Sequence, residues 1–147
     1  MIQLDELQEQ LGYRFNNTDL LYEALTHSSY AFENTATHNE RLEFLGDAIL
    51  NACTTTMLVE RFTELREGQL SHLRSRLVNT DTLAQVGASL GLGERLLLGK
   101  GIESRGGRSL PSLLADATEA VIGAIYLDSN FVTAQQLTRT LLTSRME

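Results

Sequence analysis

The 147-residue sequence contains one proline, one cysteine and no tryptophan. Without a Pro-rich or Ser-rich stretch to mark a linker, we expect one domain over residues 1–147. The lone Cys53 cannot form an internal disulfide, which fits a reducing compartment. No apolar run approaches bilayer-spanning length, and the charged start of the chain is unlike a signal or transit peptide. These absences predict a cytoplasmic protein with no membrane partner.

Basic residues are also scarce. The sequence has 12 Lys and Arg against 19 Asp and Glu, which gives a formal net charge of -7. A nucleic-acid-binding surface usually carries a basic stripe, so the net charge alone argues against one. Acidic side chains that hold divalent cations can nevertheless meet phosphates. The positions of the acidic residues therefore decide whether the negative net charge argues against nucleic-acid binding.

The hydrophobic pattern is helical throughout, without convincing strand alternation, and predicts an all-α fold. We expect Gly12 to end the first helix, Asn17 or Thr18 to cap the second, and Gly91 to stop a later one. Pro111 suits the first position of another helix, after a glycine-rich loop over residues 98–109. The expected helices cover roughly residues 4–11, 17–29, 40–62, 69–78, 81–90, 111–128 and 132–145.

The stretch NERLEFLGDAIL, residues 39–50, places acids together on one helix face. At 100° per residue, Glu40, Glu43 and Asp47 form a column opposite the apolar side chains, with Phe44 at its edge. Like charges at this spacing destabilise a helix. Gly46 costs about 1 kcal/mol relative to alanine, and its place beside the column indicates that another backbone passes close by.

The segment PSLLADATEAVIGAIYLD, residues 111–128, repeats the pattern, with Asp116 and Glu119 in line with Gly123. Two such helices could converge as a four-carboxylate site. Oxygen ligands favour Mg²⁺, or Mn²⁺ in its place, and the histidines show no zinc-binding spacing. We expect no organic cofactor, since the chain has neither a nucleophile elbow nor a phosphate-binding loop.

Structural alternatives stay open for several of these residues. The acid columns could be solvated helix faces, and Glu40 could close a capping box that begins at Thr37. Phe44 could belong to the core. His27 and His72 fit surface or cap positions, and the glycines between residues 99 and 107 fit a flexible loop without a chemical role.

The residues also resemble a known family. HNERLEFLGDAIL looks like the nine-residue signature of ribonuclease III, here residues 40–48, and LLADATEAVIGAIYLD is similar to that family's second acidic motif. Further similar segments occur in the same order and spacing, namely LGYRFNNTDLLYEALTHSSY, EGQLSHLRSRLVNTDTLA, LGKG and GGR. The resemblance covers essentially the whole chain.

The resemblance implies an all-helical endonuclease domain that forms a homodimer. It implies Mg²⁺-dependent cleavage of double-stranded RNA to 5′-phosphate and 3′-hydroxyl ends, in the processing of rRNA and mRNA precursors. By motif, the metal ligands would be Glu43, Asp47, Asp116 and Glu119, of which Asp47 and Glu119 are the catalytic pair. Glu40 and Glu67 would be accessory acids near the RNA or the subunit interface. Phe44 would enter a socket on the partner subunit.

Two departures from the family and two rival functions remain. Ala48 takes a position that is often serine, and residues 1–147 include no C-terminal double-stranded-RNA-binding domain of the kind that bacterial members usually carry. One rival is a weak or inactive relative that serves as an RNA-binding or ribosome-associated module, which loss of the metal acids would mark. The other is an acidic helical protein-interaction domain.

Overall fold

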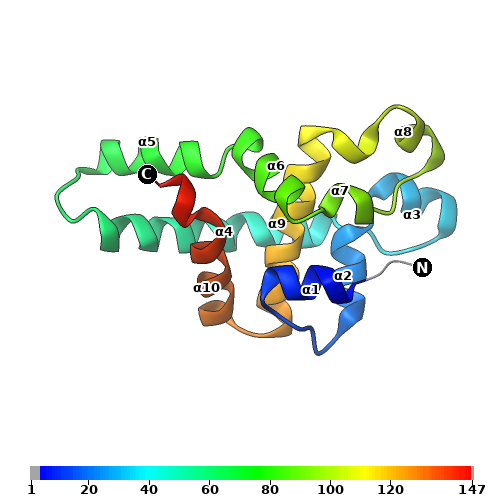
Figure 1. Cartoon of the computed structure of the whole chain (residues 1–147), viewed down its shortest axis with the longest axis horizontal. Coiled ribbons are helices and arrows are strands. Elements are labelled where there is room, and N and C mark those ends of the chain that lie inside the picture. The colour runs from blue at the N-terminus through cyan, green and yellow to red at the C-terminus, as the bar shows by residue number, and fades with distance from the viewer. Residues whose placement is uncertain (1–3, 147) are drawn as a thin grey trace.

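The protein is all-α, as predicted. The computed structural model describes residues 4–146, which form ten α-helices and two short 3-10 helices and contain no strand (Figure 1). The α-helices are α1 (Asp5–Leu11), α2 (Thr18–Leu25), α3 (Ser28–Asn34), α4 (Glu40–Arg61), α5 (Glu67–Leu77), α6 (Thr80–Ser89), α7 (Leu92–Arg95), α8 (Lys100–Ser104), α9 (Pro111–Asp128) and α10 (Phe131–Leu142). The 3-10 helices are η1 (Gly107–Ser109) and η2 (Thr143–Arg145).

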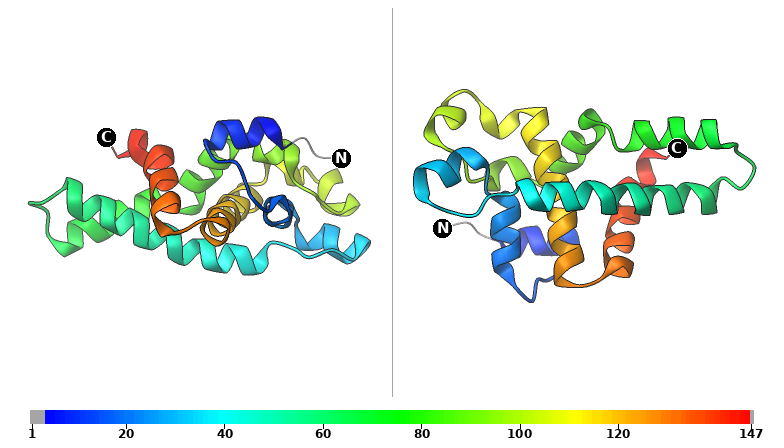
Figure 2. Two further views of the ribbon diagram at one scale, coloured as in Figure 1. Left: turned by 90° about the horizontal axis from the view of Figure 1, so that it is seen from below. Right: turned by 180° about the vertical axis from the view of Figure 1, so that it is seen from behind.

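Helix α9 forms the centre of the core. Ten of its residues are buried, including the continuous run from Ala120 to Ile125. A helix that is apolar on nearly every side belongs inside a protein, and α9 packs against α4, α6, α2 and α10. Figures 1 and 2 show α4 running along the long axis of the molecule and crossing α9, with α5 alongside the second half of α4.

Two glycines allow α4 and α9 to approach closely at their crossing. A Cβ atom on Gly46 would lie 1.7 Å from the backbone oxygen of Glu119, and one on Gly123 would lie 2.4 Å from that of Leu42. No side chain fits at either distance. The sequence-based expectation that another backbone passes close to Gly46 is therefore confirmed, and that backbone is α9.

Helix α4 is both long and central. Within residues 4–146 it is the one helix whose length and composition would allow it to cross a membrane. In this fold, however, its apolar residues Leu42, Leu50, Met57 and Leu58 are buried in the protein core. Its first half crosses α9, and its second half packs against α5.

Most helix boundaries agree with the sequence. Gly12 and Gly91 adopt positive φ at helix termini, Asn17 caps α2 by accepting a hydrogen bond from Asp19 N–H, and Pro111 is the first residue of α9. Three short helices, α3, α7 and α8, were not predicted. The glycine-rich segment 98–109 is accordingly not a continuous loop, because it contains α8 and η1.

The proposed capping box at the start of α4 is wrong. Asn39 is the residue before the helix and makes no side-chain cap; its buried amide instead donates to the backbone oxygen of Ala24 at 3.1 Å. The Asn39 N–H donates to the Thr26 oxygen at 2.9 Å. These bonds fix the first turn of α4 against the end of α2, which leaves the Glu40 side chain exposed.

Candidate metal centre

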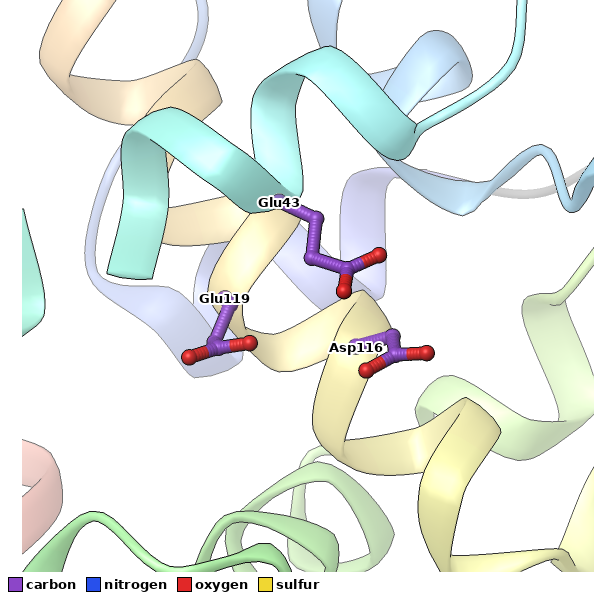
Figure 3. A group of neighbouring side chains, drawn as sticks. All are labelled: Glu43, Asp116 and Glu119. Carbon is purple, nitrogen blue, oxygen red and sulfur yellow. The ribbon is translucent and has the colours of Figure 1, made fainter. Parts of the chain in front are cut away.

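Three carboxylates meet where α4 crosses α9. One oxygen each from Glu43, Asp116 and Glu119 lies within 4.8 Å of the others, and all three side chains are half-buried. Figure 3 shows Glu43 reaching from α4 toward the two acids of α9, which stand one turn apart. The i, i+3 spacing on α9 puts Asp116 and Glu119 on one face, and the glycine contact brings that face to Glu43.

Burial, and then the hydrogen bonds and charges of neighbouring acids, shift the pKa values of this cluster. Burial, followed by the hydrogen bond and charge of Asp47, raises the pKa of Glu119 to about 8. Burial and then the charge of Asp116 raise the pKa of Glu43 to about 7. Burial also raises the pKa of Asp116, although its hydrogen bond with Glu43 acts in the opposite direction. Without a cation, the site therefore retains protons near neutral pH.

The fourth predicted ligand, Asp47, lies beside this cluster. Its side chain is exposed and hydrogen-bonds to Glu119, one turn along α4 from Glu43. Asn51 donates to the Asp47 backbone oxygen at 2.8 Å and lies 3.4 Å from its carboxylate, which restrains the side chain. The structure thus brings all four predicted acids to one place, with three of them at the separation that a single cation could bridge.

The accessory residues occupy other positions. Glu40 is exposed, its carboxylate lies 3.6 Å from His38 Nδ1, and its charge contributes to the raised pKa of Glu43. Glu67 begins α5 and lines a hollow with Thr55 of α4, which is roughly 18 Å along the helix axis from Glu43. Phe44 is not in the core, because 84% of its surface is exposed. Glu67 therefore cannot join the cluster of its own chain.

Sequence reasoning missed how the start of α4 is held. Asn39 was given no role of its own within the proposed Thr37–Glu40 capping box, whereas its buried side chain anchors the helix that carries Glu43. A polar residue directly before a helix was the available signal, but it predicts a cap rather than a contact with α2. His27 was assigned a surface or cap position, and it is the N-cap of α3, where Nδ1 accepts from Ser29 N–H.

The carboxylates are the right donors for a hard divalent cation. Mg²⁺ and Mn²⁺ prefer oxygen ligands, and a dication placed among Glu43, Asp116 and Glu119 would favour their charged forms and so oppose the burial that raises their pKa values. Binding would also displace the protons that the cluster holds. The residues present therefore fit such an ion.

We expect the metal-free protein to lose stability as pH rises from about 5 to 8. The folded-state pKa values of Glu43 and Glu119, about 7 and about 8, exceed the usual carboxyl value. The stability that protonated Glu43 and Glu119 contribute to the folded state is fully present below the usual carboxyl pKa. It is lost as pH rises through their raised folded-state pKa values. Thermal unfolding at pH 5 and 8 measures this loss of stability, which should be smaller in Glu119→Gln than in wild type. An equal loss of stability in both proteins would contradict the raised pKa values.

Comparison with known proteins gives consistent matches. A family model described as Ribonuclease-III-like matches residues 17–146. The chain is 51% identical over 146 residues to Ribonuclease 3 of Pseudomonas fluorescens, covering 99% of this chain and 62% of that protein. It is 52% identical over 129 residues to Ribonuclease 3 of Nitrosomonas eutropha, covering 88% and 51%. The chain thus spans about half to three-fifths of the length of these relatives.

Solved structures agree with the sequence matches. The nuclease domain of ribonuclease III from Campylobacter jejuni, described with flexibility in a region involved in dimer formation, has a TM-score of 0.92 and 40% identity. That match covers 97% of each chain. Dicer from Pichia stipitis matches with a TM-score of 0.69 and 26% identity, over 91% of this chain and 57% of that one.

Proposed function

The chain belongs to the ribonuclease III family, and from that premise we propose that it is a metal-dependent endoribonuclease acting on double-stranded RNA. It hydrolyses phosphodiester bonds to leave 5′-phosphate and 3′-hydroxyl ends, and it processes rRNA and mRNA precursors in the cytoplasm. The observation that carries the proposal is the cluster of Glu43, Asp116 and Glu119 at the crossing of α4 and α9.

The four acids have distinct tasks in this proposal. Glu43, Asp47, Asp116 and Glu119 hold Mg²⁺, or Mn²⁺ in its place, and the bound cation supplies charge neutralisation at phosphate and a more acidic water. Asp47 and Glu119, which share a hydrogen bond, act as the catalytic pair that orients the attacking water. Both helices are fixed in the core, so the carboxylates keep their spacing as RNA binds.

Cleavage of a duplex RNA by the purified chain tests the proposal. In Mg²⁺ at neutral pH, we expect products with 5′-phosphate and 3′-hydroxyl ends, and no products in EDTA. A single-stranded RNA of the same sequence serves as the control and should remain intact. Bound but uncut duplex in Mg²⁺ would contradict the nuclease and would instead support an RNA-binding relative without activity.

The exposed Phe44 supports a homodimer. It borders a hollow of about 530 Å³ lined partly by Leu42, Leu45 and Leu127, and the Leu127 side chain is itself 54% exposed. In a twofold interface the same patch meets its own copy, so a projecting aromatic beside an apolar hollow is self-complementary. We propose that Phe44 enters this hollow on the partner, and that Glu40 and Glu67 lie near the interface or the RNA.

Phe44→Ala should shift the dimer toward monomer at micromolar concentration, because it removes the aromatic side chain that fills the hollow. Loss of such an anchor typically costs about 2 kcal/mol or more of binding free energy. Sedimentation velocity measures the shift. Phe32→Ala is the matched control, because Phe32 is 92% exposed but lies on α3. A wild-type monomer, or an equal shift in both variants, would contradict the assignment.

A further inference from the structure

Asn39 directly precedes α4 and is buried against the end of α2. Its side-chain amide donates to the backbone oxygen of Ala24 at 3.1 Å, and its backbone N–H donates to that of Thr26 at 2.9 Å. Both oxygens lie at the C-terminal end of α2, where backbone carbonyls lack partners within the helix. Asn39 therefore supplies donors to two carbonyls that α2 itself leaves unbonded.

The same residue also starts α4. The backbone oxygen of Asn39 accepts a hydrogen bond from the N–H of Glu43 at 2.8 Å and so closes the first turn of the helix. One residue is thus bonded both to the end of α2 and to the backbone of a predicted metal ligand. Because the backbone fixes the point from which a side chain extends, Asn39 helps to set the reach of Glu43.

The end of α2 is a firm base for this link. Thr26, which follows α2, is buried. A separate segment also bonds to this part of the chain, because Leu97 N–H donates to the Leu25 oxygen at 2.9 Å and His27 N–H donates to the Leu97 oxygen at 3.0 Å. Since these bonds hold the end of α2 independently, a displacement of α4 would break the bonds of Asn39 and would not carry α2 along.

Glu43 lies between this link and the helix crossing. Gly46 is in close contact with α9, since a Cβ there would lie 1.7 Å from the Glu119 backbone oxygen. Asn39 and Gly46 are roughly 10 Å apart along the axis of α4. A helix held at one crossing alone can still change its angle to the other helix, whereas a second fixed point at that separation opposes the change. The Asn39 bonds therefore restrain the turn that presents Glu43 to Asp116 and Glu119.

We propose that Asn39 is a positioning residue for the metal centre, because it fixes the turn of α4 from which Glu43 reaches the cation. The oxygens of Glu43, Asp116 and Glu119 that could share one ion lie within 4.8 Å of one another, so a small displacement of Glu43 would remove a ligand. Residues that orient a ligand typically contribute about tenfold or more to metal affinity. This inference rests on the metal site of the proposed function.

Two matched substitutions test the role of Asn39. Asn39→Ala removes the side-chain donor to Ala24 but keeps the backbone hydrogen bonds of residue 39. The control is Gln8→Ala on α1, because Gln8 is also a buried amide, and its Oε1 accepts from Phe15 N–H at 2.7 Å. Each substitution leaves a buried backbone group unpaired, so both should lower the unfolding temperature of the metal-free protein. Helix α1 carries none of the four acids, so only Asn39→Ala should change metal binding.

The main measurement is Mn²⁺ affinity by electron paramagnetic resonance, at a temperature where circular dichroism shows both variants to be folded. We expect Asn39→Ala to bind Mn²⁺ about tenfold more weakly than wild type, and Gln8→Ala to stay within about twofold. Cleavage of duplex RNA by Asn39→Ala should need about tenfold more Mg²⁺ to reach half its maximal rate, because the substitution acts on the placement of a ligand.

Wild-type Mn²⁺ affinity in Asn39→Ala would overturn the inference, as would equal weakening in Asn39→Ala and Gln8→Ala. An Asn39→Ala chain that did not fold would also overturn it, since each of these results would leave Asn39 with a role in folding alone. Glu119→Gln is the reference for loss of a ligand. If wild type bound Mn²⁺ no better than Glu119→Gln, the metal site itself would be wrong, and the inference would fall with it.

Discussion

Glu119→Gln should abolish RNA cleavage while leaving the fold and the dimer intact. Glutamine keeps the length and helix propensity of glutamate but removes the charge that binds a cation and orients water. The loss should therefore fall on the chemical step, by several orders of magnitude in a single-turnover assay. Because Glu119 is half-buried with a pKa raised to about 8, the neutral glutamine should not destabilise the metal-free protein.

The control for this substitution is Glu9→Gln on α1, an exposed acid outside the cluster. It should change activity little, since exposed surface substitutions commonly alter stability by no more than about 0.5 kcal/mol. Circular dichroism and sedimentation on both variants establish that each remains folded and assembled. If the activity of Glu119→Gln were within tenfold of wild type, the proposed catalytic role of Glu119 would be contradicted.

Gly46→Ala should have the largest effect on stability. Its Cβ would lie 1.7 Å from the Glu119 backbone oxygen and 2.6 Å from the Glu119 carbonyl carbon, and a helix backbone cannot move aside locally. Helices α4 and α9 would have to separate, which costs roughly 3 kcal/mol or more by comparison with other overpacked cores. Separation would also displace Glu119 from Glu43, so residual activity should fall even where the variant folds.

Gly68→Ala provides the matched control, because a Cβ there has no atom within 4 Å and Gly68 lies inside α5. That substitution should be neutral or stabilising, by up to about 1 kcal/mol, since alanine is the better helix former. Denaturant unfolding of both variants measures the difference. Equal stability of Gly46→Ala and wild type would show that α4 and α9 are not in close backbone contact.

The candidate site could be largely predicted because its information is local to two helices. Acids at i, i+4 on one helix and i, i+3 on the other reveal a shared face, and a glycine beside each pair indicates close approach. Periodicity placed Glu43, Asp47, Asp116 and Glu119 correctly on their helices. Periodicity and the glycines indicated that the two faces could converge, and the resemblance then implied that the four acids are metal ligands.

The unpredicted parts depend on contacts between distant segments. Helices α3, α7 and α8 have seven, four and five residues, too short for a hydrophobic period to appear. They are held by tertiary bonds, such as the Glu33 carboxylate that accepts from Lys100 N–H at 3.0 Å. The role of Asn39 was missed for the same reason, because the partner of its side chain, Ala24, belongs to another helix.

The central claim is that a divalent cation binds among the carboxylates of α4 and α9. Anomalous X-ray diffraction from crystals soaked in Mn²⁺ tests it most directly. We predict a peak at bonding distance, about 2.1 Å, from oxygens of Glu43, Asp116 and Glu119. The peak should disappear in Glu119→Gln crystals soaked in the same way. A wild-type crystal with Mn²⁺ bound elsewhere and none at this crossing would contradict the account.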